Sequence, residues 1–250
     1  MRSLVIMFSK NKQQQLAIVL IYVLLLAGGL WHALNVLQPE MRLLASPTIM
    51  AVCLLLCFDY GRNVSNGNAN RAPAKHGVMA TLQQAAKLRW RFIAWSSSVI
   101  VASFLIELLG VKTGAVFGVY AYAEVLQPTL WDVPMSIGFA WLGMIISSAA
   151  ISQRILPGHA AWREIAMPIF IAWFMVIFDF FMEPAAAKLG YWHWAGNMVP
   201  LRNYVAWFVF GWILSGIGVR LGLFTKKLSP VALHAYAAQL VYFAMVRMLK

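Results

Sequence analysis

Charged residues are scarce in this chain: only 11% of its 250 residues are Asp, Glu, Lys or Arg, whereas 62% are hydrophobic. No soluble fold encloses that much apolar surface, and the mean hydropathy of +0.72 indicates an integral membrane protein. Acidic residues are rarest, 8 against 20 basic ones, which gives a net charge of +12. Because no basic stripe lies outside the membrane flanks, we expect anionic lipids, and not nucleic acid, as the partner of this charge.

Clusters of metal-binding residues are also lacking. Cys53 and Cys57 lie four residues apart in one apolar run, which offers neither a disulfide loop nor further zinc ligands. The five histidines are isolated, unlike those of membrane di-iron oxygenases. No second acidic motif accompanies Asp179-x-x-x-Glu183, and no Gly-rich phosphate loop is present. The sequence therefore predicts neither a metal nor a cofactor.

Seven apolar segments approach or exceed the length of about 20 residues that a membrane-spanning helix needs. They are residues 16–37, 43–60, 92–109, 134–153, 165–182, 203–221 and 230–249. Residues 113–127 are too short to cross as a helix, which favours a re-entrant or interfacial segment. No linker is long enough to separate domains. We therefore predict a single all-α domain over residues 1–250, a polytopic membrane bundle of about seven transmembrane helices.

The only extended polar region, residues 61–91, is interpreted as a basic cytoplasmic loop. Its second half, residues 78–90, also suits an amphipathic helix on the membrane surface. A cytoplasmic N-terminus places about fourteen basic residues inside and six outside, as the positive-inside rule requires. This distribution predicts an inner-membrane protein with its N-terminus in the cytoplasm and its C-terminus outside.

Three carboxyl groups lie near one end of the predicted spans. Asp179 and Glu183 are four residues apart and share a helix face, although Pro184 predicts that the helix ends at Glu183. Glu107 and Asp179 follow the starts of their spans by 15 and 14 residues, which is roughly 21–23 Å at ~1.5 Å per residue. We therefore expect one acidic cluster beneath the outer leaflet. The sixth span, capped by Asn203, would point its positive end at this cluster.

Aromatic residues flank these acids in the sequence: Tyr120, Tyr191, Trp192, Trp194 and Trp207. A carboxylic acid in an apolar pocket holds its proton and can act as a general acid, and aromatic faces stabilise a cation. Together they suit the protonation of an alkene to a tertiary carbocation, which hydration, cyclisation or isomerisation can follow. The same residues also suit a proton relay in a transporter, and Trp and Tyr at span ends commonly form interfacial belts.

The order and spacing of these residues resemble those of a known family. In the first half the similar motifs are Glu107-Leu-Leu-Gly-Val-Lys-Thr-Gly114, Phe117-Gly-Val-Tyr120-Ala-Tyr122 and Val133-Pro134. In the second half they are Asp179-x-x-x-Glu183-Pro184, Gly190-x-Trp192-x-Trp194, Pro200-x-x-Asn203-Tyr204 and Trp207-Phe208. The resemblance, over roughly residues 92–222, is to the membrane carotenoid-biosynthesis family, whose characterised members are the CruF-type carotenoid 1,2-hydratases. One departure is Met198, where the family pattern has a glycine.

The resemblance implies a cofactor-independent hydratase that adds water to the terminal 1,2 double bond of an acyclic carotenoid ψ-end, as in γ-carotene or lycopene. Asp179 would donate the proton, and Glu183 or Glu107 would share it or activate water. The other implied site residues are His193 and Asn203, which orient water, and Tyr120, Tyr122, Tyr191, Trp192, Trp194 and Trp207, which line the substrate. A carotenoid in the bilayer and other carotenoid enzymes are the implied partners. The alternatives are another carotenoid enzyme, such as a cyclase, and a non-enzymatic transporter.

Overall fold

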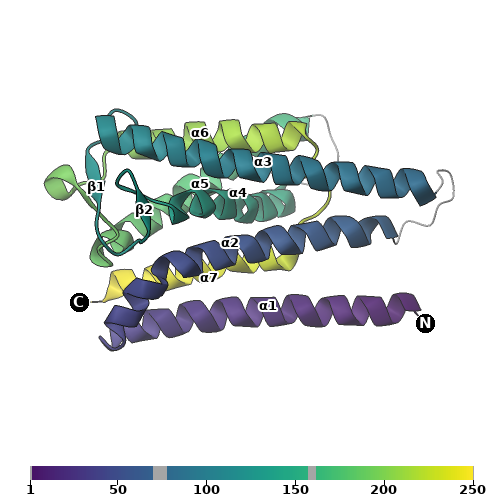
Figure 1. The fold of residues 1–250 in the computed structure, drawn as a ribbon, viewed down its shortest axis with the longest axis horizontal. Coiled ribbons are helices and arrows are strands. Elements are labelled where there is room, and N and C mark those ends of the chain that lie inside the picture. The colour runs from purple at the N-terminus through teal and green to yellow at the C-terminus, as the bar shows by residue number, and fades with distance from the viewer. Residues whose placement is uncertain (1, 70–77, 157–161, 250) are drawn as a thin grey trace.

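The protein is a bundle of long helices that run up and down along one axis. The computed structural model describes residues 2–69, 78–156 and 162–249. Its elements are α1 (Arg2–Ala33), α2 (Gln38–Ala69), α3 (Val78–Thr113), β1 (Tyr120–Tyr122), β2 (Thr129–Leu130), β3 (Val133–Pro134), α4 (Ser136–Ile155), α5 (Trp162–Lys188), β4 (Trp192–Trp194), a 3-10 turn η1 (Ala195–Asn197), α6 (Leu201–Arg220) and α7 (Pro230–Met248). α1 begins at one end of the bundle and α7 ends at the other (Figure 1). The predicted all-α architecture is confirmed.

Six of the described helices are long and apolar enough to cross a membrane: α1, α2, α3, α4, α5 and α7. The remaining helix, α6, has 20 residues but carries Arg202 and Arg220 at its two ends. α6 packs along α5, so it belongs to the same bundle. The number, length and composition of these helices make the chain an integral membrane protein.

α4 is the central helix of the bundle. Of its most apolar stretch 83% is buried inside the protein, compared with 22% for α1 at the edge. The buried residues of α4 include Gly143, Ser147, Ser148 and Ala149. Small residues let neighbouring backbones approach closely, which matters in a membrane because lipid provides no hydrophobic force between helices. α2, α3, α5 and α7 accordingly all pack against α4.

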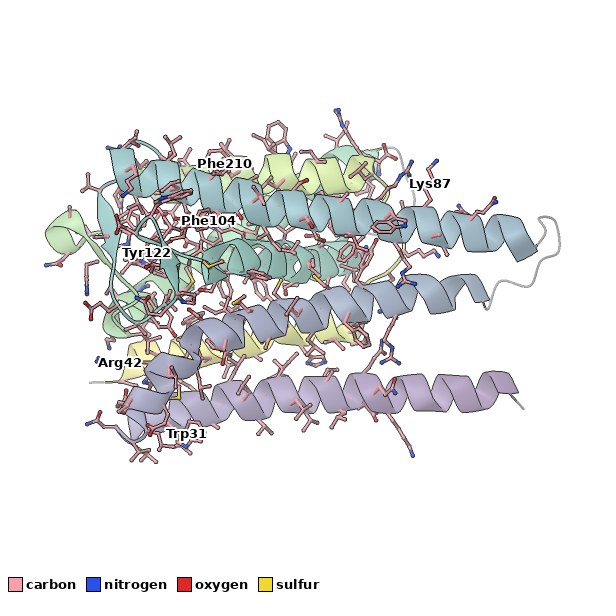
Figure 2. All side chains as sticks on the ribbon, in the orientation of Figure 1. Trp31, Arg42, Lys87, Phe104, Tyr122 and Phe210 are labelled. Carbon is pink, nitrogen blue, oxygen red and sulfur yellow. The ribbon has the colours of Figure 1, made fainter. Side chains whose placement is uncertain are left out.

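Most of the loop predicted at residues 61–91 is helical, and this part of the prediction is wrong. α2 continues to Ala69 and α3 begins at Val78, while residues 70–77 lie outside the described part of the chain. Residues 78–91 are rich in Ala, Gln, Leu, Lys and Arg and contain neither Gly nor Pro, so they extend the third span as one helix instead of lying on the membrane surface. Figure 2 shows Lys87 on this extension, far from the Tyr122 end of the bundle.

α5 also runs further than predicted. The sequence placed its end at Glu183 because Pro184 follows, yet the helix continues through Pro184 to Lys188. A proline costs one backbone hydrogen bond, and packed neighbouring helices in a membrane bundle tolerate that loss. Asp179 and Glu183 therefore both lie on regular helix, one turn apart on the same face.

Residues 113–127 form a loop with a short strand at the bundle end, consistent with the non-spanning segment that the sequence predicted. β1 pairs with β4 in antiparallel register, Tyr120 opposite Trp194 and Tyr122 opposite Trp192. The loop packs closely against Pro200 at Gly118, whose φ is +121°. A Cβ at this position would lie only 2.6 Å from Pro200 Cγ, so glycine is required there. This two-stranded sheet positions the site described next.

Candidate active site

A cavity of ≈ 90 Å³ lies at the end of the bundle where β1 and β4 pair. Predicted site residues that line it are Glu107, Tyr120, Tyr122, Glu183, Tyr191, Trp192, Trp194, Asn203 and Trp207. The other two predicted residues, Asp179 and His193, are not part of its lining. α3, β1, α5, β4 and α6 thus contribute side chains to one space, which the separate motifs of the sequence had suggested.

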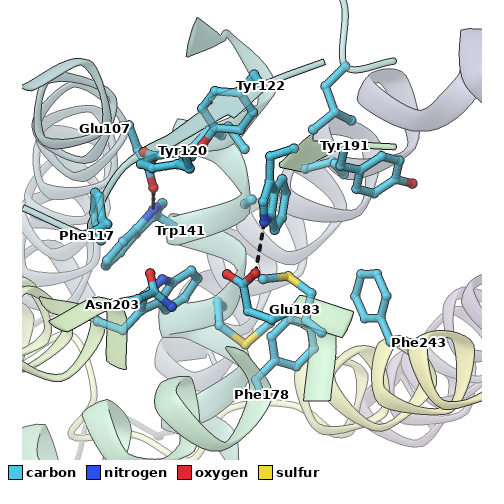
Figure 3. A pocket seen from close by; sticks show the side chains of 18 of the residues that line it. Glu107, Phe117, Tyr120, Tyr122, Trp141, Phe178, Glu183, Tyr191, Asn203 and Phe243 are labelled. Carbon is cyan, nitrogen blue, oxygen red and sulfur yellow. Dashed lines mark hydrogen bonds between the residues drawn. The ribbon is translucent and has the colours of Figure 1, made fainter. Parts of the chain in front are cut away.

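Glu107 accepts three hydrogen bonds from side chains that enclose it. The hydroxyl groups of Tyr120 and Tyr122 donate to Oε2 at 2.5 and 2.9 Å, and Trp141 Nε1 donates to Oε1 at 3.0 Å (Figure 3). The Glu107 side chain is buried. Because both carboxyl oxygens accept bonds and all three partners donate them, the surroundings suit a carboxylate.

The two tyrosines keep their protons in this environment. Burial raises the pKa of the Tyr120 hydroxyl above its ordinary value, and the nearby negative charge of Glu107 raises it further. The pKa of Tyr122 is raised for the same two reasons. Both phenols therefore stay neutral well into the alkaline range, and their hydrogen bonds to Glu107 persist there.

Strand alternation turns four aromatic residues toward the cavity. Successive side chains of a strand point to opposite faces, so Tyr120, Tyr122, Trp192 and Trp194 share one face of the β1–β4 pair. The rings of Tyr120 and Trp194 lie 4.9 Å apart between centroids, and those of Tyr122 and Trp192 lie 5.9 Å apart. The same alternation directs His193 away from the cavity, and its side chain is exposed.

Glu183 lies at the centre of the cavity, across from Glu107 (Figure 3). Trp192 Nε1 and Trp194 Nε1 both donate to Glu183 Oε2, at 2.9 and 2.7 Å. These two indoles come from β4, so the pairing of β4 with β1 also holds the Glu183 carboxyl in place. One oxygen of Glu183 is thereby fixed by two donors.

Asp179 lies one helical turn before Glu183, is completely buried and does not line the cavity. Asn203 Nδ2 donates to Asp179 Oδ2 at 2.6 Å, whereas Asp179 Oδ1 has no hydrogen-bond partner in the structure. Asp179 and Glu183 are four residues apart on one face of α5, so their carboxyl groups are neighbours. Two carboxyls form a hydrogen bond to each other only when one carries a proton, so the pair suits one shared proton.

The predicted capping role of Asn203 is wrong. The N-cap of α6 is Pro200, and the backbone N–H of Asn203 donates to the Pro200 carbonyl. The Asn203 side chain is instead buried against Asp179. An amide at the third helical residue points along the first turn toward α5, which packs against α6, and this tertiary contact prevails over local capping.

Several lining residues were missed by the sequence analysis: Ile49, Phe117, Trp141, Phe178, Gln239 and Phe243. Trp141 matters most, because it donates to Glu107 and stacks on Trp207 with ring centroids 4.4 Å apart. A signal was present, since Trp141 lies several residues inside a predicted span, deeper than the interfacial belt where tryptophan usually occurs.

The arrangement places two acidic positions around an apolar, ring-lined space inside a membrane bundle. One position, the Asp179–Glu183 pair, suits a proton donor, and the other, Glu107, suits a proton acceptor. Among the residues that the structure describes, no group of three or more His, Cys, Asp or Glu side chains is arranged to hold a metal ion. Acid, base and cation-stabilising rings together fit proton-initiated chemistry on an alkene.

Comparison with known proteins points the same way. Residues 74–249 match the family model described as carotenoid biosynthesis protein. A bisanhydrobacterioruberin hydratase from Haloarcula japonica is 30% identical over 118 residues, which is 46% of this chain. The aligned part covers 38% of that relative, so the chain spans well under half of its length. No solved structure matches the chain.

Proposed function

Because the chain belongs to the carotenoid biosynthesis protein family, we propose that it is a hydratase that adds water to the terminal 1,2 double bond of an acyclic carotenoid ψ-end, as in γ-carotene or lycopene. The observation that carries the proposal is the apolar cavity with Glu183 and Glu107 on facing sides and aromatic rings between them. The partial similarity to a hydratase supports the same reaction type.

The proposed reaction needs one acid and one base. A proton moves from Glu183 to C2, and the electron pair of the double bond forms the new C–H bond. The tertiary cation left at C1 is attacked by water, and Glu107 takes the proton that the water oxygen loses. A neutral tertiary alcohol results, and return of the proton from Glu107 to Glu183 restores both groups. Hydration is not a redox step, so the chemistry itself requires no redox cofactor.

Glu183, and not Asp179, is the better candidate for the group that touches the substrate. The sequence favoured Asp179 as the proton donor, but Glu183 lines the cavity and Asp179 does not. Asp179 lies next to Glu183 on the side away from the cavity, where it can share a proton with Glu183. The hydrogen bond that Asn203 donates to Asp179 fixes the orientation of its carboxyl group. We assign Asp179 to supplying and holding this proton.

The cation would lie against aromatic faces on the Glu107 side of the cavity. Trp141 and Trp207 stack with an interplanar angle of 17°, and both line the cavity. The negative face of an aromatic ring attracts a cation, by about 2 kcal/mol or more when the site is desolvated. Trp141 also contacts Glu107, so the ring that stabilises the cation would lie beside the base that takes the proton from the attacking water.

The substrate would reach this site from within the bilayer. We place the protein in the inner membrane with its N-terminus in the cytoplasm, because the basic residues concentrate on that side. The C-terminal ends of α3 and α5, which carry Glu107 and Glu183, then lie toward the outer leaflet. Association with other carotenoid enzymes would pass the poorly soluble substrate along without release into water.

Coexpression in a host that makes lycopene or γ-carotene tests the proposed function. Wild-type protein is expected to convert the pigment to a product heavier by one water molecule, detected by mass spectrometry. A product of unchanged mass with a cyclised end would indicate a cyclase instead. Unchanged pigment, with the protein present in the membrane, would count against catalysis on these substrates.

Asp179→Asn is expected to lower hydration by about 10²-fold, because the shared proton is lost while the contact with Asn203 can still form. The pigment products of the variant, measured against membrane protein level, check this. The exposed Glu124 offers a matched control, since Glu124→Gln also removes one carboxyl. Full activity in Asp179→Asn would remove Asp179 from the mechanism.

His193→Ala is expected to change hydration by no more than about twofold, because substitutions of exposed side chains that make no special contacts have small effects. The sequence predicted that His193 orients water, but its side chain faces away from the cavity. Product yield in the same host measures the effect. A tenfold loss of hydrated product would show that His193 takes part in the reaction.

A further inference from the structure

A second cavity of ≈ 90 Å³ adjoins the acid-lined one. It lies between α1, α2 and α7, and among the residues of α1 and α2 that line it are Gly28, Ala45 and Thr48. Four residues line both cavities: Ile49, Tyr191, Gln239 and Phe243. The two spaces are therefore separated only by a shared wall of side chains.

The shared wall lies on one side of the acid-lined cavity. Figure 3 shows Tyr191 and Phe243 on the far side of Glu183 from Glu107 and Phe117. A chain that enters through this wall would pass Glu183 and bring its end toward Glu107. The two cavities are thus arranged in the order in which a long substrate would occupy them.

Space alone requires a second compartment for a long substrate. A cavity of about 150 Å³ takes up one benzene molecule, so ≈ 90 Å³ holds at most the end group of an isoprenoid. The lining of the second cavity is mostly apolar, with leucine, valine and methionine from α1 and α2. Such a surface suits a hydrocarbon chain and not a charged ligand.

The second cavity also reaches the lipid-facing surface. Leu24 of α1 and Leu44 of α2 both line it, yet 43% and 46% of these residues are exposed on the outside of the bundle. The cavity therefore extends to leucines of α1 and α2 that also face the lipid. Gly28 lets the Met41 side chain of α2 pack closely against α1 beside this cavity, because a Cβ there would lie 3.1 Å from Met41 Cε.

We propose that the cavity between α1, α2 and α7 holds the polyene chain next to the reacting end group, and that the rest of the chain leaves between Leu24 and Leu44 into lipid. This inference rests on the proposed function, since it names the compartment for the non-reacting part of that substrate. α1 and α2 both precede the region matched by the family model, so this compartment joins an N-terminal element to the catalytic end of the bundle.

Filling the second cavity tests the inference. Ala45→Leu and Thr48→Leu add bulk to its wall, whereas Ala51→Leu makes the same type of change on the exposed face of α2. Each variant is purified in detergent from a host that makes lycopene, and the bound polyene is measured by absorbance per mole of protein. We expect the bound polyene to fall at least about fivefold in both lining variants, and Ala51→Leu to retain as much as wild type.

Further variants separate binding from catalysis and from misfolding. Glu183→Gln should retain the polyene although its hydration is strongly reduced, and Thr48→Val, which preserves side-chain volume, should bind as wild type does. Equal retention by Ala45→Leu, Thr48→Leu and wild type would overturn the inference, because it would show that the polyene does not occupy this cavity. If wild type binds polyene in this pattern but forms no hydrate, the proposed function fails and the binding compartment stands.

Discussion

Glu183→Gln is expected to reduce hydration of an acyclic carotene by about 10²–10⁴-fold, the contribution typical of a positioned general acid. The amide has nearly the shape of the acid and can still accept the bonds that Trp192 and Trp194 donate to Glu183. It has no proton acidic enough to protonate an alkene. Pigment mass analysis, normalised to the amount of protein in the membrane, measures the loss.

The controls for this variant separate the loss of the acidic proton from any effect on folding. Glu124→Gln removes an exposed carboxyl from the loop between β1 and β2 and is expected to leave product yield unchanged. Glu183→Gln should also elute and unfold as wild type does, because its hydrogen-bond partners are kept. A Glu183→Gln protein that still hydrates at more than a tenth of the wild-type rate would rule out Glu183 as the proton donor.

Glu107→Gln is expected to lower hydration by about 10²-fold by removing the base that takes the proton from water. Trp141 can only donate, and the amide oxygen can accept its bond. Tyr120 and Tyr122 can accept as well as donate, so their hydroxyls can rotate to meet the amide N–H₂. The variant should therefore fold and bind polyene while its turnover falls.

Glu107→Leu provides the contrasting stability experiment. Leucine leaves the donors of Tyr120, Tyr122 and Trp141 without their acceptor, and each unpaired buried donor costs about 1–3 kcal/mol. Thermal unfolding in detergent should therefore separate Leu, strongly destabilised, from Gln, close to wild type. If Glu107→Gln proved as unstable as Glu107→Leu, the role of Glu107 would be structural rather than catalytic.

The apolar segments of this chain are a local property, and the sequence determined them well. A run of about 20 apolar residues can satisfy its backbone in lipid only as a helix, so six of the predicted spans appear as helices that can cross a membrane. The position of Glu107 and Glu183 at the same end of the bundle also followed from local rules. Helix rise and the four-residue spacing from Asp179 set their depth and face.

The ends of the helices were harder to predict from the sequence. Pro184 and the polar residues after Gly61 both predicted breaks, and both helices continue. Local helix preferences amount to less than about 0.7 kcal/mol per residue for most residues, about 1 for glycine and about 3 for proline. Contacts with neighbouring helices outweigh them, and those contacts do not appear in a single segment of sequence.

What the tertiary structure alone decided is which side chains share a space. The pairing of β1 with β4 joins residues about seventy positions apart, and its register turns Trp192 and Trp194 onto Glu183 while directing His193 outward. A shift of one residue would have reversed these faces. Helix packing likewise enclosed Asp179 behind Glu183, brought Trp141 to Glu107 and left a second cavity between α1, α2 and α7. The sequence supplied the acids and the rings, and long-range packing assigned each its place, because side-chain proximity depends on contacts between segments far apart in the chain.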